Sequence, residues 1–323
     1  MKTRSTLINN LADTISRVHR DHPIRVGIRV NMDTGIYPMW SRFGFNLENE
    51  EAMEAIKRLV SGNKLIPVGL HCHIGTFILD PDAYSRQVEK LVILANQIQD
   101  DFGFEMDYLD IGGGFPSQSR LKNAPNLSNS DLPSIDVYAE AICEALFKNL
   151  RPGCFPKLIV ESGRALIDEG GTLISSVVAD KRMPDGTKAY VIDAGVNLLF
   201  TSNWYRFDIA TDRKVPGFCE NSIVYGPLCM NIDVIDESLM LPPLRKGSRL
   251  LISPVGAYNN TQWMQFIHYR PNIVLIGENG DVDIIRQAED ITDISRRERL
   301  PQRLSAGLTN GGDHEAALYQ IAV

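Results

Sequence analysis

Residues 67–76 read PVGLHCHIGT and place His71 and His73 two positions apart, with a glycine and a threonine directly after them. Side chains two apart on an extended strand point to the same side. Two imidazoles on one side of a strand can bind zinc, lie against a cofactor ring, or pack as ordinary core histidines. The pattern alone leaves these three interpretations open, so the neighbouring strand ends become important.

Three further apolar runs end in residues of functional type. They are Asn31 with Asp33, the segment DIGGGFP at 110–116, and the segment ESGR at 161–164. Ligands of parallel α/β proteins bind at the carboxyl ends of the strands. Four such ends on consecutive strands, counting the one after His71, therefore indicate one pocket.

The residue types at these ends favour a ligand that carries a phosphate. Backbone N–H groups in glycine-rich turns bind phosphate, and Arg164 adds a fixed positive charge. Glu161 is a carboxylate at the end of a buried strand, and such a group needs a positive partner. A phosphate and a protonated aromatic nitrogen in one ligand would satisfy both, which describes pyridoxal 5′-phosphate (PLP). His73 would then lie against the ring.

Two styles of secondary structure follow each other along the chain. Apolar runs at 24–33, 65–76, 106–116 and 157–166 alternate with amphipathic segments at 49–62, 80–103 and 135–150, which predicts a parallel sheet with crossover helices. Beyond residue 170 short strands and tight turns predominate, which predicts a mainly antiparallel β domain. The expected organisation is an α/β domain over 1–169, a β domain over 170–300 and a tail over 301–323 whose weak patterning predicts disorder.

Composition excludes several classes of protein. The chain has 323 residues, 44% of them hydrophobic, and a formal net charge of −7, so it has no basic surface for nucleic acid. No apolar run is long enough to cross a membrane, and the first residues, with apolar positions at helical spacing, do not form a signal peptide. Five scattered cysteines without a CxxC pair favour a reducing cytoplasm.

At this point six motifs carry a family resemblance. HCHIGT, YLDIGGGFP, VESGRAL, YVIDAG, YGPLC followed by an aspartate, and GAY occur in this order over roughly residues 24 to 295. The set resembles the fold-type III PLP-dependent decarboxylases, which include the diaminopimelate, ornithine and arginine decarboxylases and share a barrel with alanine racemase. In motif style it is nearest to the diaminopimelate decarboxylases, because SRFGF stands where these have SKFG.

The resemblance implies roles for individual residues. His73 stacks on the ring of PLP, and Glu161 pairs with the ring nitrogen and keeps it protonated. Cys229 comes from the partner subunit of a head-to-tail homodimer with shared active sites and delivers a proton after carbon dioxide leaves. Asp193 and Tyr205 border the amino-acid substrate. The remaining cofactor-binding positions are Thr76, Gly113, Gly114, Ser162, Gly163, Arg164 and Tyr258.

One element of the family is missing from this sequence. The Schiff-base lysine of the family lies in a motif of the form A-x-K-A-N on the first barrel strand, and no lysine here matches it. By motif order, residues 24–31 correspond to the fifth of eight barrel strands. The expected fold is therefore a partial (β/α)8, alanine-racemase-like barrel without about four strand–helix units, or about 125 residues. A fragment, a split gene or a late start codon would explain this, and the chain alone should be inactive.

Two substrate positions also depart from the diaminopimelate decarboxylases. Met230 replaces the acidic residue that follows the motif cysteine, and Thr201 replaces an arginine that holds the distal carboxylate. Pro254 also stands where the family has aspartate. A buried charge without a partner is costly, so a substrate without a charged distal end is expected.

These observations predict a PLP-dependent amino-acid decarboxylase, present here as a truncated form. Two alternatives stay open. One is a catalytically inactive homologue or regulatory subunit that keeps the fold, which the missing lysine favours. The other is a metal-dependent barrel hydrolase built on the His71 and His73 pair. The remaining histidines argue against it, because they lie outside the strand ends.

Overall fold

The computed structural model describes residues 14, 17, 23–62, 64–122 and 132–305. The residues before 20 with apolar positions at helical spacing fall outside this part except for 14 and 17, and so do residues 123–131 and residues 306–323 of the expected tail. The chain divides into two compact units, residues 1–262 and 263–323. This division follows compactness, whereas the boundaries expected at 170 and 300 follow the change in secondary structure, and those boundaries stay a prediction.

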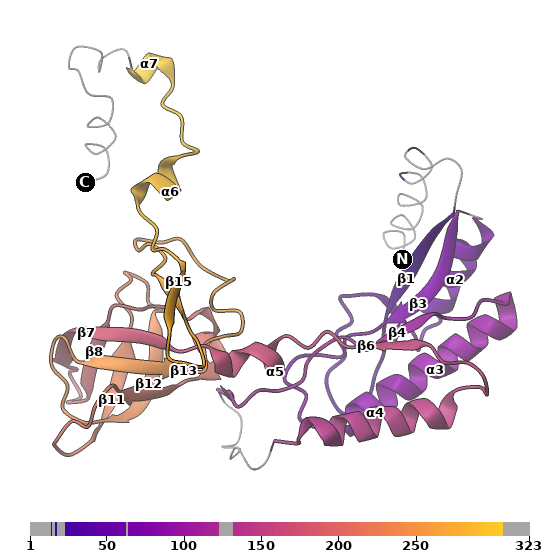
Figure 1. Ribbon diagram of the computed structural model, residues 1–323, viewed down its shortest axis with the longest axis horizontal. Helices are drawn as coiled ribbons and strands as arrows, with labels where there is room; N and C mark the ends of the chain where they lie inside the picture. Colours follow the sequence, from indigo (N-terminus) through magenta and orange to yellow (C-terminus); the bar gives the residue numbers. More distant parts are fainter. Residues whose placement is uncertain (1–13, 15–16, 18–22, 63, 123–131, 306–323) are drawn as a thin grey trace. The chain divides into compact units, whose positions relative to one another are not determined.

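Five parallel strands form the first sheet, in the order β2-β1-β3-β4-β6 (Figure 1). The helices that alternate with them are α2 (Glu51–Ser61), α3 (Asp82–Phe102) and α4 (Ile135–Asn149). This confirms the predicted alternation of strand and helix up to about residue 165. The strands are β1 (Ile24–Asn31), β2 (Phe45–Asn46), β3 (Leu65–His71), β4 (Tyr108–Asp110) and β6 (Lys157–Ile159).

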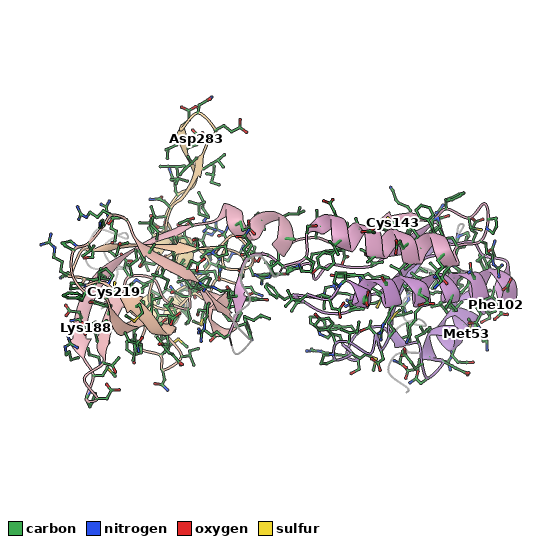
Figure 2. The ribbon with its side chains drawn as sticks, turned by 90° about the horizontal axis from the view of Figure 1, so that it is seen from below. Met53, Phe102, Cys143, Lys188, Cys219 and Asp283 are labelled. Carbon is green, nitrogen blue, oxygen red and sulfur yellow. The ribbon has the colours of Figure 1, made fainter. Side chains whose placement is uncertain are left out.

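The core of this region lies between the sheet and its helices. Strand residues such as Ile28, Leu70 and Leu109 pack with buried apolar residues from α2, α3 and α4. Met53 marks α2 and Phe102 the last residue of α3 in Figure 2. Each fully buried aliphatic side chain contributes roughly 1.5–3 kcal/mol relative to an exposed one, so the apolar periodicity of these segments is sufficient to fix which face is inside.

The opposite face of the sheet carries small, polar and charged residues. Tyr108 lies flat across two glycines of neighbouring strands, because a Cβ atom on Gly27 or on Gly69 would fall well inside the van der Waals radius of the tyrosine ring or hydroxyl. His71 and Asp110 are aligned with each other on the adjacent strands β3 and β4. This face therefore has room for polar groups where the helix-covered face has none.

The sheet is open in the described part of the chain. β2 pairs with β1 only at Val30 and Asn31, so the first six residues of β1 have no strand on that side among the described residues, and β6 forms the other edge. A closed barrel has no free edge. The expectation of a partial eight-stranded barrel stays a prediction.

A six-stranded sheet follows, in the order β10-β13-β7-β8-β11-β12. Its pairs are antiparallel except for β8 with β11, which agrees with the predicted mainly antiparallel β region. A short antiparallel pair joins Leu121 on β5 to Tyr205 on β9. The strands are β5 (Arg120–Leu121), β7 (Leu173–Arg182), β8 (Lys188–Ile192), β9 (Tyr205–Arg206), β10 (Asp208–Thr211), β11 (Glu220–Tyr225), β12 (Val234–Leu241) and β13 (Arg249–Ser253).

The second unit contains a hairpin and two short helices. β14 (Ile273–Ile276) and β15 (Val282–Arg286) are antiparallel and are joined by the segment GENGD, which forms the hairpin turn. The short helices are α6 (Ile291–Ser295) and α7 (Gln302–Ser305). Among the described residues, no helix combines the length and the apolar character that crossing a bilayer requires.

Candidate active site

His73 lies just beyond β3, next to the glycine turn that follows β4. Its Nδ1 accepts a hydrogen bond from the N–H of Gly113 at 3.1 Å, which places the ring proton on Nε2. A Cβ atom on Gly112 would lie 2.8 Å from that Nδ1, so glycine is required for this approach. Burial lowers the pKa of His73 below its usual 6.5, and the charge of Arg29 lowers it further, so the ring is neutral at neutral pH.

Trp40 stands against the same histidine. The two ring centroids are 5.2 Å apart and the ring planes meet at 69°, an edge-on contact. Trp40 comes from the segment just before SRFGF, which the sequence analysis quoted only as a motif. Its side chain limits the orientations that are open to the imidazole, and it was not predicted as a site residue.

Glu161 reaches the same place from the end of β6. Its backbone N–H donates to the carbonyl of Gly112 at 2.8 Å, and a Cβ atom on Gly113 would come within 2.5 Å of the Glu161 carbonyl oxygen. Its Oε2 lies 3.5 Å from Nε2 of His71, and 54% of its side chain is exposed. The structure therefore brings His73, the glycine turn and Glu161 together, as the strand ends predicted.

Helix α3 supports this arrangement from the core side. The hydroxyl of Tyr84 donates to the carbonyl of Gly113 at 3.1 Å, and burial raises the pKa of this phenol, so it stays a donor. Nε2 of Gln87, which is fully buried, donates to the carbonyls of Cys72 at 2.7 Å and Ile111 at 2.9 Å. Two side chains of one helix thus fix the ends of both β3 and β4.

Arg164 occupies a second cluster, centred on α5 (Arg164–Ile167). Its side chain is 7% exposed, and its Nη1 donates to Oδ2 of Asp168 at 2.9 Å. The guanidinium carbon lies 4.1 Å from the ring centre of Tyr205 and 5.1 Å from that of Tyr258. Burial raises the pKa of Tyr205, whose hydroxyl also shares a hydrogen bond with the side chain of Thr76. Four residues predicted to bind cofactor or substrate are therefore neighbours.

Asp168, which begins the 3-10 turn η2 (Asp168–Gly170), was not predicted as a site residue. It is 2% exposed, and Oδ2 also accepts from the hydroxyls of Ser117 at 2.6 Å and Ser119 at 2.7 Å. Oδ1 accepts from the N–H of Ala257 at 3.1 Å. One carboxylate therefore joins the loop after β4, the start of η2 and the GAY segment.

The predicted substrate residues have partners of their own. Oδ1 of Asp193 accepts from the Ser175 hydroxyl at 2.6 Å and from the N–H of Ser176 at 2.8 Å. Thr201, in the 3-10 turn η3 (Phe200–Asn203), is 3% exposed, and both its N–H and its hydroxyl donate to Oδ1 of Asn259, at 3.1 and 2.9 Å. The Thr201 hydroxyl therefore donates its hydrogen bond within the protein.

Cys229 is exposed, and it lies in a loop that a buried carboxylate holds in place. Oδ1 and Oδ2 of Asp233 accept the N–H groups of Val196 and Leu228, each at 2.7 Å. The DAG segment and the GPLC segment are thereby connected, and Met230 beside Cys229 is half-buried. Within the described residues, Cys143 on α4 and Cys219 before β11 are also exposed (Figure 2).

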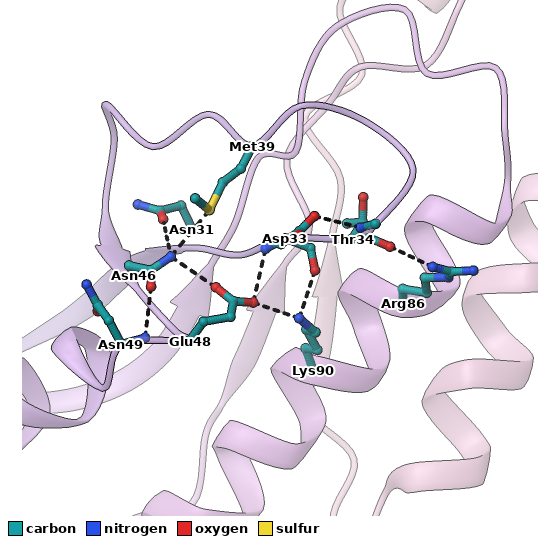
Figure 3. A network of polar contacts seen from close by, with 10 residues as sticks. Asn31, Asp33, Thr34, Met39, Asn46, Glu48, Asn49, Arg86 and Lys90 are labelled. Atoms are coloured by element: carbon teal, nitrogen blue, oxygen red, sulfur yellow. Dashed lines mark hydrogen bonds and ion pairs between the residues drawn. The ribbon is translucent and has the colours of Figure 1, made fainter.

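The first strand end serves a different purpose. Nδ2 of Asn31 donates to the carbonyls of Phe43 at 2.5 Å and Gly44 at 3.1 Å. The N–H of Asp33 donates to Glu48 at 3.0 Å (Figure 3). Lys90 of α3 closes this network with a 2.6 Å ion pair to Glu48. Burial disfavours the charged form of Glu48, but hydrogen bonds from Lys90 and Asp33 outweigh it and lower its pKa. These residues hold the loop that carries Trp40.

The structure brings together a different set of possible metal ligands from the His71 and His73 pair that the sequence indicated. Ligand atoms of His71, Asp110 and Glu161 lie within 4.8 Å of one another, while His73 is outside this group. Of the other histidines, His268 lies in the second unit, and His19, His22 and His314 lie outside the described residues.

The residues present fit PLP. The turn of Gly112 to Gly114 leaves no room for side chains, a neutral imidazole stands beside it, and Glu161 offers a half-exposed carboxylate. Nε of Arg164 is buried and has no hydrogen-bond partner in the described part of the chain, as expected of a donor that awaits an anion.

Comparisons with known proteins agree with this fit. Residues 8–168 match the family model described as the pyridoxal-dependent decarboxylase, pyridoxal binding domain. The diaminopimelate decarboxylase of Archaeoglobus fulgidus is 29% identical over 90% of this chain and 70% of its own length, and that of Aquifex aeolicus is 32% identical over 82% and 62%.

Among solved structures, diaminopimelate decarboxylase from M. jannaschii in complex with L-lysine has a TM-score of 0.79 and 26% identity, and the match covers 93% of this chain and 69% of that one. The curated relatives that this chain matches are longer, and the chain spans between 57% and 70% of their length. Residues 8–168 thus match the pyridoxal-binding domain of the pyridoxal-dependent decarboxylases, and the α/β and β-rich parts of the chain share the fold of diaminopimelate decarboxylase.

Proposed function

We propose that this chain provides the cofactor-binding face of a PLP-dependent amino-acid decarboxylase. The observation that carries the proposal is the meeting of His73, the glycine turn and Glu161 at one end of the parallel sheet. When bound there, PLP supplies an electron sink for the substrate. His73 would support the ring, Glu161 would hold a proton at the ring nitrogen, and Arg164 with Thr76 and Tyr258 would bind the phosphate.

We further propose that turnover needs a lysine that this sequence does not supply. No lysine here stands in an A-x-K-A-N motif, and the side of β1 opposite β3 is unpaired over most of its length among the described residues. An unpaired strand edge offers free N–H and C=O groups to a further strand. In a barrel the missing strands would extend from this edge of β1 round to β6, and the first of them, which carries the lysine, would pair with β6.

The test supplies the purified chain with PLP and a polypeptide that contains the lysine-bearing strands of a relative, and follows release of carbon dioxide from amino acids. Release is expected from the mixture and not from this chain alone. The matched control is the same polypeptide with its motif lysine replaced by alanine. Release without any added lysine would contradict the proposal.

For the substrate, we propose an α-amino acid whose distal end carries no charge. Thr201 has both donors committed to Asn259, and Met230 offers no charge beside Cys229. An apolar site rejects a charged group because the group loses its hydration there and gains no partner for its charge. In a competition assay, neutral-ended or conjugated analogues should exceed meso-diaminopimelate, lysine and ornithine in kcat/KM, and the highest value for meso-diaminopimelate would contradict this proposal.

We propose that the active assembly is a homodimer in which Cys229 serves the site of the partner. Its exposure and the fixed loop around Asp233 support a role across an interface. In the form completed with the lysine-bearing strands, mixing a Cys229→Ala variant with a variant of the cofactor lysine should restore up to about a quarter of the activity, because half of the random dimers contain one intact site. No recovery would contradict the shared site.

A second candidate function is a catalytically inactive subunit that keeps the fold. The missing lysine motif favours it. PLP binding without turnover in every reconstituted mixture would select this candidate over the decarboxylase.

A further inference from the structure

His71 has no task in the proposed function, yet it lies beside the residue on which that function depends. It is the last residue of β3, and 19% of its side chain is exposed. Its Nε2 is buried and makes no hydrogen bond within the described residues, while Oε2 of Glu161 stands 3.5 Å away. A small rotation of either side chain would close this gap to a hydrogen bond.

The carboxylate of Glu161 needs such a partner. Its backbone is fixed by the 2.8 Å hydrogen bond to Gly112, but its side chain is 54% exposed, and among the described residues only His71 makes an ionic contact with it. Fixing a free glutamate side chain costs conformational entropy. A carboxylate already directed by a neighbour avoids much of this cost when a ligand binds.

The other charged groups around His71 are accounted for. Asp110 on β4 already accepts the N–H of Gly112 with its Oδ1 at 2.9 Å. Arg29 on β1 aligns with His71 in the strand register, and its guanidinium lies over the ring of Phe43 at 4.8 Å. His73 is engaged through Nδ1 with Gly113. Among the described residues, Glu161 is the carboxylate that lies within ion-pair distance of Nε2 of His71.

We propose that His71 is a positioning residue whose Nε2–H directs the Glu161 carboxylate toward the ring nitrogen of PLP. The inference rests on the proposed function, because it requires Glu161 to face that nitrogen. His71 itself does not contact the ring or the substrate. It acts through Glu161, so its removal should change how the site recognises the nitrogen and leave recognition of the phosphate intact.

The same three side chains also have the composition of a metal site, and one substitution separates the two possibilities. Glutamine at position 71 places an amide N–H near the position of Nε2, so it can still donate to Glu161. A carboxamide is a poor ligand for zinc compared with an imidazole. His71→Gln therefore retains the positioning function and removes the metal ligand.

The experiment measures binding of two ligands by equilibrium dialysis with the full chain. One ligand is PLP, and the other is its 1-deaza analogue, in which carbon replaces the ring nitrogen. His71→Leu should weaken PLP roughly tenfold, the size expected for one hydrogen bond to a charged group, and leave the analogue unchanged. His71→Gln should restore most of the PLP affinity. The matched control is His268→Leu, at an exposed position in the second unit.

The ratio of the two dissociation constants within one variant does not depend on how much of the sample is folded, so partial unfolding of His71→Leu cannot imitate the expected result. Equal weakening of both ligands would overturn the inference, because it would make His71 a packing residue. Loss of PLP binding in His71→Gln together with stoichiometric zinc in the unmodified chain would overturn it in favour of a metal site.

The inference and the proposed function fail differently. If the unmodified chain binds PLP and His71→Leu binds it equally well, only the role of His71 is wrong. If the unmodified chain binds neither ligand, the proposed cofactor site is wrong and the role of His71 falls with it.

Discussion

At the carboxyl end of the parallel sheet, the main chain of Gly112 and Gly113 is packed too closely for side chains, and its polar atoms each have a different partner, from Asp110, Glu161, His73 or Tyr84. Beside the six-stranded sheet, two buried carboxylates each accept hydrogen bonds from two segments that are far apart in sequence. Asp168 accepts from Ser117 and Ala257. Asp233 accepts from Val196 and Leu228. The first region therefore depends on space for the backbone, and the second on single charged side chains.

The largest effect should come from breaking the second kind of support. Asp168→Ala leaves the buried Arg164 without its ionic partner and three further donors without an acceptor, so the free energy of unfolding should fall by about 4 kcal/mol. Urea denaturation measures this. The double variant Arg164→Met, Asp168→Ala should regain part of the loss, because no uncompensated charge stays buried. A double variant less stable than the single one would contradict this account.

Substitution in the glycine turn tests the first kind of support. Gly114 has φ +104°, and a Cβ atom there would collide with the carbonyl oxygen of Gly75, which belongs to the backbone and cannot swing away. Gly114→Ala should cost about 3 kcal/mol in the same denaturation assay. Gly103→Ala is the matched control, since Gly103 also has positive φ but open space around it, and should cost about 1 kcal/mol. Equal losses would show that close approach is unimportant.

A smaller effect is expected at Asp233. Asp233→Asn exchanges one of two accepting oxygens for an amide group that faces an N–H. The free energy of unfolding should therefore fall by about 2 kcal/mol. Asp236→Asn serves as control, because its oxygen accepts the N–H of Ser238 and the amide keeps such an oxygen. If both variants unfold at the same urea concentration, the connection between the DAG and GPLC segments contributes little.

The smallest expected effect is a pH dependence at His73. Its native pKa is lowered by burial and by Arg29, so on acidification the unfolded chain takes up a proton near pH 6.5 before the native chain does. Stability should therefore fall as the pH decreases through 6.5, until the native pKa is reached. His73→Gln should reduce this slope in urea midpoints measured across that range, and an unchanged slope would assign it to other groups.

The two regions also differ in how much of them could be predicted from the sequence. The strand ends, the glycine turn and Glu161 were found because apolar runs and glycines are local patterns, and parallel strands bring their ends to one edge. Asp168 was missed because its partners Ser117 and Ser119 are about fifty positions away, and no local pattern in LIDEGG announces them. Pairings of this kind depend on tertiary contacts.

Gln87 is an intermediate case. It lies on the same helical face as Tyr84, Val88 and Leu91, all of them buried. A polar residue within an apolar stripe needs hydrogen-bond partners, so the pattern of α3 already contained a signal that this position supports backbone groups. Trp40 offered no comparable signal, because a single aromatic residue in a loop does not indicate what it contacts.

The tyrosine that lies across two strands of the parallel sheet limits how this face can change over evolutionary time. Any side chain at Gly27 or Gly69 would meet the ring of Tyr108, so a larger residue at either glycine is acceptable only after position 108 has become small. The three positions form one unit of substitution, in which the order of mutations matters. Libraries that vary this face should therefore randomise all three together, since single changes would mostly be lost.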